Sequence, residues 1–340
     1  MGDMIFFVPP VLESLKKTFP DCHITMVTAW GFKNKKGQWG KRNQDGFCIA
    51  LLMHDPHIDQ LVHWHDTDLS LDATICQEAE MSFSTWNKSY YEKQKTSGTY
   101  DGVYELDFGM GIYDNPMERI YQTIGLPEET NTNYRFYATD AEKEVASLVM
   151  ASYPQPRIFL LEGLEGQTSR GWDPGKIPDL ENQLSKKYDV TPLWFGGRHV
   201  RFYKGRPLTL RENIACLLYG SIGIGVLSGP LHFAAAIGLP TVTLYADHPI
   251  HRAAPAYFLN PYISETLKKH RTLVGPTSQE YKILKNEVVP EALTPKEVRH
   301  QYFIDWLRPG KQATKTGLAA ITVDEVMTVV EDMLPASINV

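Results

Sequence analysis

The chain has 340 residues, which is long for one hydrophobic core and suits two domains of ordinary size. Its composition, 43% hydrophobic and 22% charged, is globular and excludes a largely disordered chain. The net charge of −6 argues against extensive nucleic-acid binding, because proteins that bind a phosphate backbone carry a surplus of Lys and Arg.

The cysteines and the hydropathy pattern predict a protein of a reducing compartment. The four cysteines lie far apart and form no C-x-x-C pair, which argues against a zinc site or a redox dithiol; they are Cys22, Cys48, Cys76 and Cys216. No stretch approaches the roughly 20 apolar residues that a membrane span needs. No signal-peptide pattern is present, so we expect a cytoplasmic protein.

Helices and strands are predicted to alternate along the first half. Apolar residues at helical spacing indicate a helix around 11–17, and a β-rich run indicates a strand over 23–27. Residues 31–46 are polar and contain glycine, as a loop does. A short strand is expected near 58–62 and an amphipathic helix over 140–150.

Residues 63–68, H-W-H-D-T-D, contain side chains of the types that bind metal ions. His63 and His65 would share one face of a strand, with Asp66 and Asp68 close by. The alternative is a strand end that runs into a polar loop. We favour this alternative, because a metal site needs ligands that converge from elsewhere in the fold, and we predict no metal.

The segment Pro154-Gln155-Pro156 is the best candidate for a domain boundary. It separates a predicted N-terminal domain, 1–155, from a C-terminal domain, 156–340, and the next strand begins directly after it. The other elements predicted for the second half are a helix over 177–188, a strand over 190–195, a helix from Thr209 and a terminal helix over 322–334. Two alternating halves indicate the α/β class.

The most informative stretch is 213–247, which predicts a parallel strand–turn–helix–strand unit. Ile222 to Val226 is a glycine-interleaved apolar strand, and Ser228-Gly229-Pro230 combines an N-cap residue, a turn residue and a helix-starting proline. A helix follows as far as Gly238, and the next strand covers 242–245. The turn places N–H groups of a helix N-terminus at the carboxyl end of a strand, where α/β proteins bind phosphate. Many such turns bind nothing, so the pattern alone leaves both readings open.

Four blocks of the sequence, in order, resemble the bacterial heptosyltransferases of glycosyltransferase family 9. Gly2-Asp3 with the segment 9–25 resembles the opening block of that family, and 169–174 is similar to its K-x-W-P loop, with Arg170 in place of Lys. The segment 208–238 resembles its block with the G-x-D-T-G-x-x-H motif, and 319–326 its closing helix.

The resemblance implies the fold and the activity of the family. The implied fold is GT-B: two Rossmann-like domains face a cleft, and the C-terminal helix crosses back to the N-terminal domain. The implied reaction is inverting and independent of metal ions and cofactors, and it moves heptose or a related sugar from a nucleotide-sugar donor such as ADP-heptose. The acceptor is a hydroxyl group of a glycan, such as lipopolysaccharide core, or of another molecule.

The resemblance also implies the roles of particular residues. Asp3 matches the general base of the family, which removes the proton of the acceptor hydroxyl. The donor-binding residues would be Arg170, Ser228, Gly229, Pro230, Leu231 and His232. The helix-start N–H groups and the Arg170 charge would stabilise the leaving diphosphate, and His232 would contact phosphate or the core.

Two features depart from the family pattern. Leu227 stands where the family has Asp before T-G, so a donor contact is missing or moved. The first strand of the family precedes G-D, whereas this sequence begins at Met1, so that strand is absent or lies upstream. We therefore keep two alternatives to a transferase: a catalytically silent nucleotide-sugar-binding protein, and a nucleotide-sugar epimerase on the same fold.

Overall fold

The computed structural model describes residues 2–28, 47–63, 92–104, 121, 123–126, 135–164, 171–196, 199–245, 269–274 and 316–334. The chain divides into two compact units. The larger comprises 1–10, 112–115 and 131–340, and the smaller comprises 11–111 and 116–130. The predicted domain boundary at residue 155 stays a prediction.

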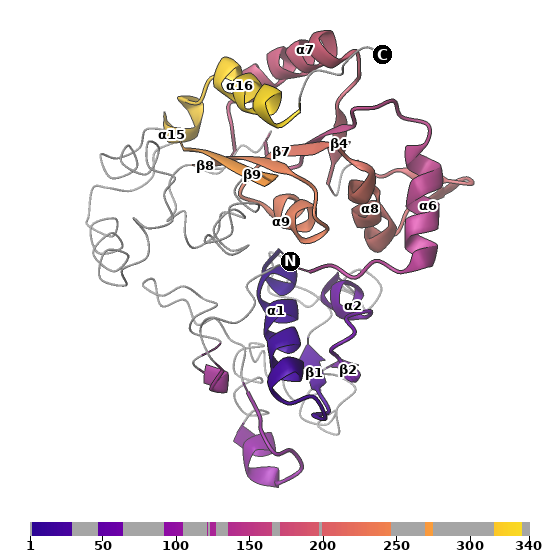
Figure 1. The fold of residues 1–340 in the computed structure, drawn as a ribbon, viewed down its shortest axis with the longest axis vertical. Helices are drawn as coiled ribbons and strands as arrows, with labels where there is room; N and C mark the ends of the chain where they lie inside the picture. The colour runs from indigo at the N-terminus through magenta and orange to yellow at the C-terminus, as the bar shows by residue number, and fades with distance from the viewer. Residues whose placement is uncertain are drawn as a thin grey trace, which may run out of the picture. The chain divides into compact units, whose positions relative to one another are not determined.

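A five-stranded parallel sheet forms the centre of the larger unit (Figure 1). Its strand order is β4-β3-β7-β8-β9, and the neighbouring strands pair in parallel throughout. The strands are β3 (Ile158–Leu161), β4 (Leu193–Phe195), β7 (Ile222–Val226), β8 (Thr241–Tyr245) and β9 (His270–Val274). The α/β class with a parallel sheet is therefore confirmed.

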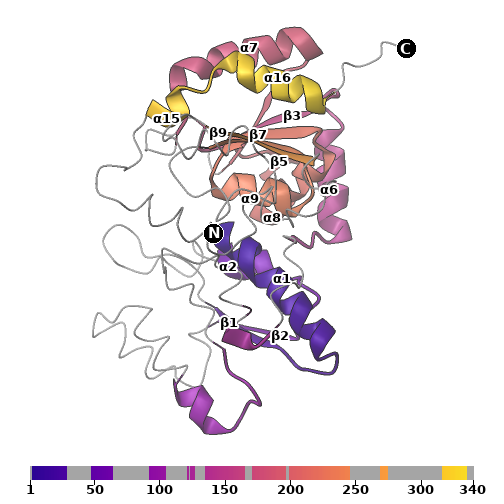
Figure 2. The ribbon, with the colours of Figure 1, turned by 60° about the vertical axis from the view of Figure 1, so that its left-hand side comes forward.

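Helices cover both faces of this sheet (Figures 1 and 2). One face carries α7 (Ile177–Tyr188) and α16 (Val323–Met333), and the other carries α8 (Leu210–Cys216) and α9 (Gly229–Ala236). The predicted unit from 222 to 245 forms as expected: β7, the α9 crossover and β8 follow one another, and β7 pairs with β8. Short elements complete the unit: η2 (Pro174–Lys176), β5 (Phe202–Tyr203), β6 (Arg206–Pro207), η3 (Leu217–Tyr219) and α15 (Thr316–Ala319).

The glycines of β7 allow this central strand to pack closely against its neighbours. A Cβ atom on Gly225 would lie 2.9 Å from Leu161 Cβ, and one on Gly220, just before the strand, would lie 2.7 Å from the Phe159 ring. Real Cβ atoms do not approach so closely, so larger side chains at these positions would have to displace the core.

The last described helix, α16, packs on α7 and over β8 and β9 of the same unit. The predicted crossing of the C-terminal helix back to the N-terminal domain stays a prediction. Its apolar face joins the core beneath it, and the buried residues are Val323, Val326, Met327 and Val330. The capping box of Thr322 and Glu325 fixes where α16 begins.

Near the N-terminus the structure forms a long helix and two short strands. Helix α1 (Gly2–Thr18) starts nine residues before the predicted position and contains Pro9 and Pro10, so the helix is not confined to the apolar face recognised from the sequence. The two strands predicted in this region form as β1 (Thr25–Thr28) and β2 (Gln60–His63). They pair in parallel, and α2 (Phe47–Leu52) precedes β2. Lys16 on α1 holds the two strand starts together, since its Nζ lies 2.6 Å from Asp59 Oδ2 and also donates to Cys22 O.

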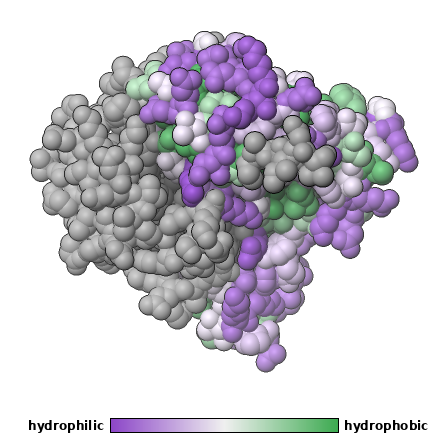
Figure 3. Space-filling model, turned by 45° about the horizontal axis from the view of Figure 1, so that its top comes forward, coloured by the Kyte–Doolittle hydropathy of each residue, from purple (hydrophilic) through white to green (hydrophobic). Residues whose placement is uncertain are grey.

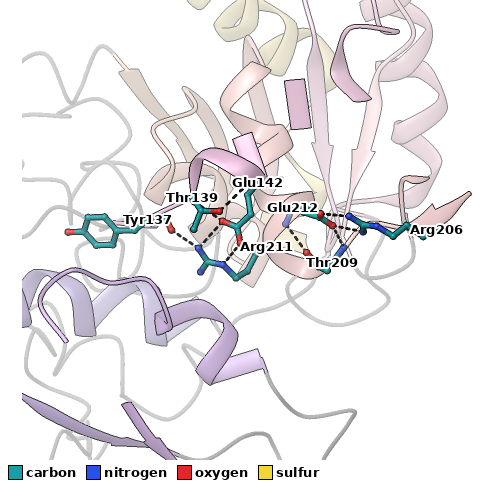
Figure 4. A network of polar contacts seen from close by, with 7 residues as sticks. All are labelled: Tyr137, Thr139, Glu142, Arg206, Thr209, Arg211 and Glu212. Atoms are coloured by element: carbon teal, nitrogen blue, oxygen red, sulfur yellow. Dashed lines mark hydrogen bonds and ion pairs between the residues drawn. The ribbon is translucent and has the colours of Figure 1, made fainter. Parts of the chain in front are cut away.

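A partly buried ion pair joins α6 (Asp140–Met150) to α8 (Figure 4). Arg211 Nε donates to Glu142 Oε1 at 2.6 Å, and Arg211 Nη2 donates to the carbonyl of Tyr137. Burial alone would raise the pKa of Glu142, but the hydrogen bonds from Arg211 and the Thr139 backbone lower it. The capping box of Thr139 thus fixes both the start of α6 and its attachment to α8.

The surface of the described residues is mostly polar on the side that Figure 3 presents. With the α7 and α16 side turned forward, the coloured part of the surface is mainly hydrophilic, and its hydrophobic residues form small groups (Figure 3). Within the described ranges, no helix is both long and apolar enough to cross a bilayer.

We expect His270 to make the folded state sensitive to mild acid. The ring is 3% exposed, Nδ1 lies 2.9 Å from Thr241 Oγ1, and burial lowers the pKa of His270 from 6.5 to about 3. Between these values the unfolded chain binds the extra proton, so the free energy of unfolding should fall as pH falls below 6.5. The loss should approach about 1.4 kcal/mol per pH unit for this group.

Urea unfolding at pH 7.0, 6.0 and 5.0 tests this prediction. The variant His270→Gln keeps a polar side chain but does not titrate, so it should lose stability less steeply than the parent over this interval. Equal slopes for the two proteins would show that His270 does not carry the effect.

Candidate functional site

The candidate site lies at the carboxyl ends of β3, β4 and β7. These strands are adjacent and parallel, so the residues that follow them meet at one edge of the sheet. Glu162 and Gly163 follow β3, Gly196 follows β4, and Leu227 and Ser228 follow β7. The carboxyl edge of a parallel sheet is the usual ligand position in open α/β folds.

Ser228 caps the helix that starts at this edge. Its backbone is extended, with φ −156° and ψ 166°, and its Oγ accepts a hydrogen bond from Leu231 N–H at 3.4 Å. Pro230 has no N–H group, and Leu231 N–H is already bonded to the cap. The Gly229 N–H, in the first turn of α9, is therefore the best placed donor for an anionic ligand.

Two glycines bring the strand ends close together. Gly163 has φ +113°, which favours glycine, and a Cβ there would lie 3.2 Å from Ser228 Cβ. At Gly196 a Cβ would overlap the Cβ and Oε2 atoms of Glu162. The Glu162 side chain therefore lies across the backbone at the end of β4, and Glu162 N–H donates to Phe195 O at 2.7 Å.

His232 lies in the first turn of α9 and is 7% exposed. The backbone N–H of His232 donates to Ser228 O at 3.2 Å, and the ring atom Nδ1 is buried. The ring is therefore buried near the positive end of the helix dipole. Its contact with phosphate stays a prediction.

The structure brings together five of the seven predicted site residues. Ser228, Gly229, Pro230, Leu231 and His232 form the cap and first turn of α9. Asp3 is the second residue of α1, and its side chain lies outside the described set. Arg170 also lies outside the described residues, and so do residues 64–68 of the segment 63–68 that was considered for metal binding. Among the residues that the structure describes, no group of three or more His, Cys, Asp or Glu side chains is arranged to hold a metal ion.

Sequence reasoning missed Glu162, Gly163 and Gly196. A usable signal was present for the first two, because a Glu-Gly pair directly follows the apolar run 158–161 and so stands at a predicted strand end. Nothing local marks Gly196 as a neighbour of Glu162.

Aromatic and cationic side chains support the end of β4. His199 stacks on Trp194 with ring centroids 5.3 Å apart, and Trp194 Nε1 donates to Glu181 at 2.8 Å. Arg201 donates from Nη2 to Trp194 O at 2.9 Å, and its burial lowers the pKa of its guanidinium. These contacts support the end of β4, and Phe195 at this end accepts the hydrogen bond from Glu162 N–H.

Comparison with solved structures identifies the same fold in glycosyltransferases. A glycosyl transferase family 9 protein from Veillonella parvula matches with a TM-score of 0.58 at 15% identity, over 98% of this chain and 93% of that chain. The E. coli ADP-heptose LPS heptosyltransferase II matches with a TM-score of 0.56 at 14% identity, over 97% and 94%. E. coli heptosyltransferase WaaC with ADP-2-deoxy-2-fluoro heptose matches with a TM-score of 0.51 at 12% identity, over 98% and 96%.

Sequence comparison finds no such relative. No protein-family model matches the chain, and no curated protein does. The resemblance to glycosyltransferase family 9 that the sequence motifs indicated is thus confirmed by structure, at the level of the fold.

Proposed function

We propose that this protein is a glycosyltransferase that moves a sugar from a nucleotide-sugar donor to an acceptor hydroxyl. The main observation in support is that the N-terminus of α9 lies at the carboxyl ends of β3, β4 and β7, in a fold shared with family 9 glycosyltransferases. The proposal extends to a GT-B arrangement, in which the two halves face a cleft, and to an inverting mechanism without a metal ion.

On the donor side, the first turn of α9 would hold the diphosphate. Gly229 N–H and the positive helix end stabilise the negative charge that grows on the leaving group. Arg170 would add a charge-assisted hydrogen bond, and His232 would support the first turn. The solved relatives include heptosyltransferases whose structures carry ADP or an ADP-heptose analogue, so we place ADP-heptose first among the donors to test.

On the acceptor side, Asp3 would remove the hydroxyl proton. An inverting transfer in one step needs only a carboxylate within hydrogen-bond reach of the attacking oxygen. The acceptor class we propose is a glycan hydroxyl, with lipopolysaccharide core as the first candidate, and the proposed location is the cytoplasm.

Two rival functions share the same donor site. A silent binding protein, which Leu227 favours because it replaces a polar donor contact, would bind the donor and release no nucleoside diphosphate. An epimerase would convert the donor without any acceptor. Incubation with ADP-, GDP- and UDP-sugars, with and without a glycan acceptor, distinguishes the three: only a transferase needs the acceptor for turnover.

Replacing Gly229 with Val should weaken donor binding. The new side chain would stand at the first position of α9, where the ligand must approach the backbone, and we expect a loss of ~1–3 kcal/mol in binding free energy. Calorimetric titration with the donor measures the loss. Ser221→Ala, at the amino end of β7, is the matched control and should bind as the parent does. Equal affinity of the Gly229 variant and the parent would place the diphosphate elsewhere.

A further inference from the structure

Glu162 is the one carboxylate, among the described residues, that directly follows a strand of the five-stranded sheet. The positions that follow the adjacent strands are Gly196 after β4 and Leu227 and Ser228 after β7. Glu162 therefore supplies the acidic group of the described part of this edge.

The backbone fixes where the Glu162 carboxylate lies. Hydrogen bonding to Phe195 O extends the β3–β4 pairing to Glu162, so its backbone is held as part of the sheet. The side chain occupies the space that a Cβ on Gly196 would need. Gly163, the next residue, packs against the Ser228 cap of α9. The carboxylate thus stands beside the helix start and is separated from it by one glycine.

This placement determines which part of a ligand the carboxylate can accept. A phosphate group would be repelled by Glu162, so the phosphates belong at the Gly229 N–H and the helix end. An ionised carboxylate only accepts hydrogen bonds, and its two oxygens suit two neighbouring hydroxyl groups. Leu227, which directly follows β7, offers no side-chain polar group that could do this instead.

We propose that Glu162 is a specificity-determining residue that binds neighbouring hydroxyl groups of the nucleotide sugar next to its diphosphate. The assignment rests on the proposed donor site and names the chemistry that this site selects. The hydroxyls are those of the ribose or those of the transferred sugar. Because Gly196 has no side chain, the Glu162 carboxylate has space beside it.

Binding by the Glu162→Gln variant tests the assignment. The best-bound of ADP, GDP and UDP is chosen with the parent protein, and its 2′-deoxy form and its sugar conjugate complete the set. Gln keeps the shape but loses the charge, and a lost hydrogen bond to a charged group corresponds to roughly a 10–100-fold weaker affinity.

The ligand set distinguishes the two sources of hydroxyls. If Glu162 binds the ribose, the parent should prefer the nucleoside diphosphate to its 2′-deoxy form, and Glu162→Gln should lose this preference. If it binds the transferred sugar, the variant should lose affinity for the sugar conjugate only. Gly196→Ala should reproduce either result, because its methyl group displaces the Glu162 side chain.

Two controls separate the possible failures. Glu144→Gln removes an exposed charge from α6 and should bind as the parent does, and thermal unfolding confirms that each variant is folded. Unchanged affinities of Glu162→Gln for every ligand that the parent binds would overturn this assignment alone. A parent that binds none of the nucleotides or sugar conjugates would overturn the proposed function and this assignment together.

Discussion

Asp3→Asn is expected to slow sugar transfer about 10²–10⁴-fold, the usual contribution of a general base. Asn keeps the shape and polarity of Asp3 but cannot take the proton from the acceptor hydroxyl. Donor affinity should stay close to that of the parent, because the base acts on the acceptor. Steady-state release of nucleoside diphosphate with saturating donor and acceptor measures the rate.

The competing role of Asp3 is structural. Asp3 lies in the first turn of α1, where a carboxylate interacts favourably with the helix dipole and where Asn is also well tolerated. In that case Asp3→Asn should keep turnover within a few-fold of the parent and leave the free energy of unfolding nearly unchanged. A turnover that stays within this range would reject the base and favour the silent binding protein. Measuring pH dependence adds a second criterion: only a base gives a rate that rises as its carboxyl ionises.

Trp172→Ala is expected to lower the free energy of unfolding by ~3–5 kcal/mol, the range for removing a buried aromatic side chain. The Trp172 side chain is 1% exposed and belongs to the core between the sheet, α7 and α16. Its Nε1 donates to Ile321 O at 3.0 Å, in the segment just before α16. The substitution therefore leaves a cavity and also releases the anchor of the C-terminal helix. Urea unfolding followed by circular dichroism measures the loss.

Trp172→Phe separates packing from the hydrogen bond. Phe fills most of the site, and Ile321 O still accepts from Lys176 Nζ at 2.8 Å, so we expect a smaller loss of ~1–2 kcal/mol. Combining it with Lys176→Met should cost more than the sum of the two single changes, because Ile321 O then loses both donors. Equal losses for Trp172→Phe and Trp172→Ala would show that the hydrogen bond, and not the core volume, carries the stability.

Local sequence determined the elements that the site is built on. Strand β7, the Ser228 cap, α9 and β8 all follow from neighbouring residues, because an apolar run, an N-cap residue and a helix-starting proline act within a few positions. The capping boxes of Thr209 and Thr322 lie where their patterns predict them. The fold resemblance was visible for the same reason, since each block that carries it is a short local pattern.

Only the tertiary structure decided which distant residues meet. Glu162, Gly196 and Ser228 follow different strands, and their closeness depends on the strand order and the register of the sheet. The true start of α1 and the packing of α16 on α7 were also set beyond the local pattern. An amphipathic helix shows in its sequence that one face must be buried, but the surface that buries it is chosen by shape and by contacts between remote segments.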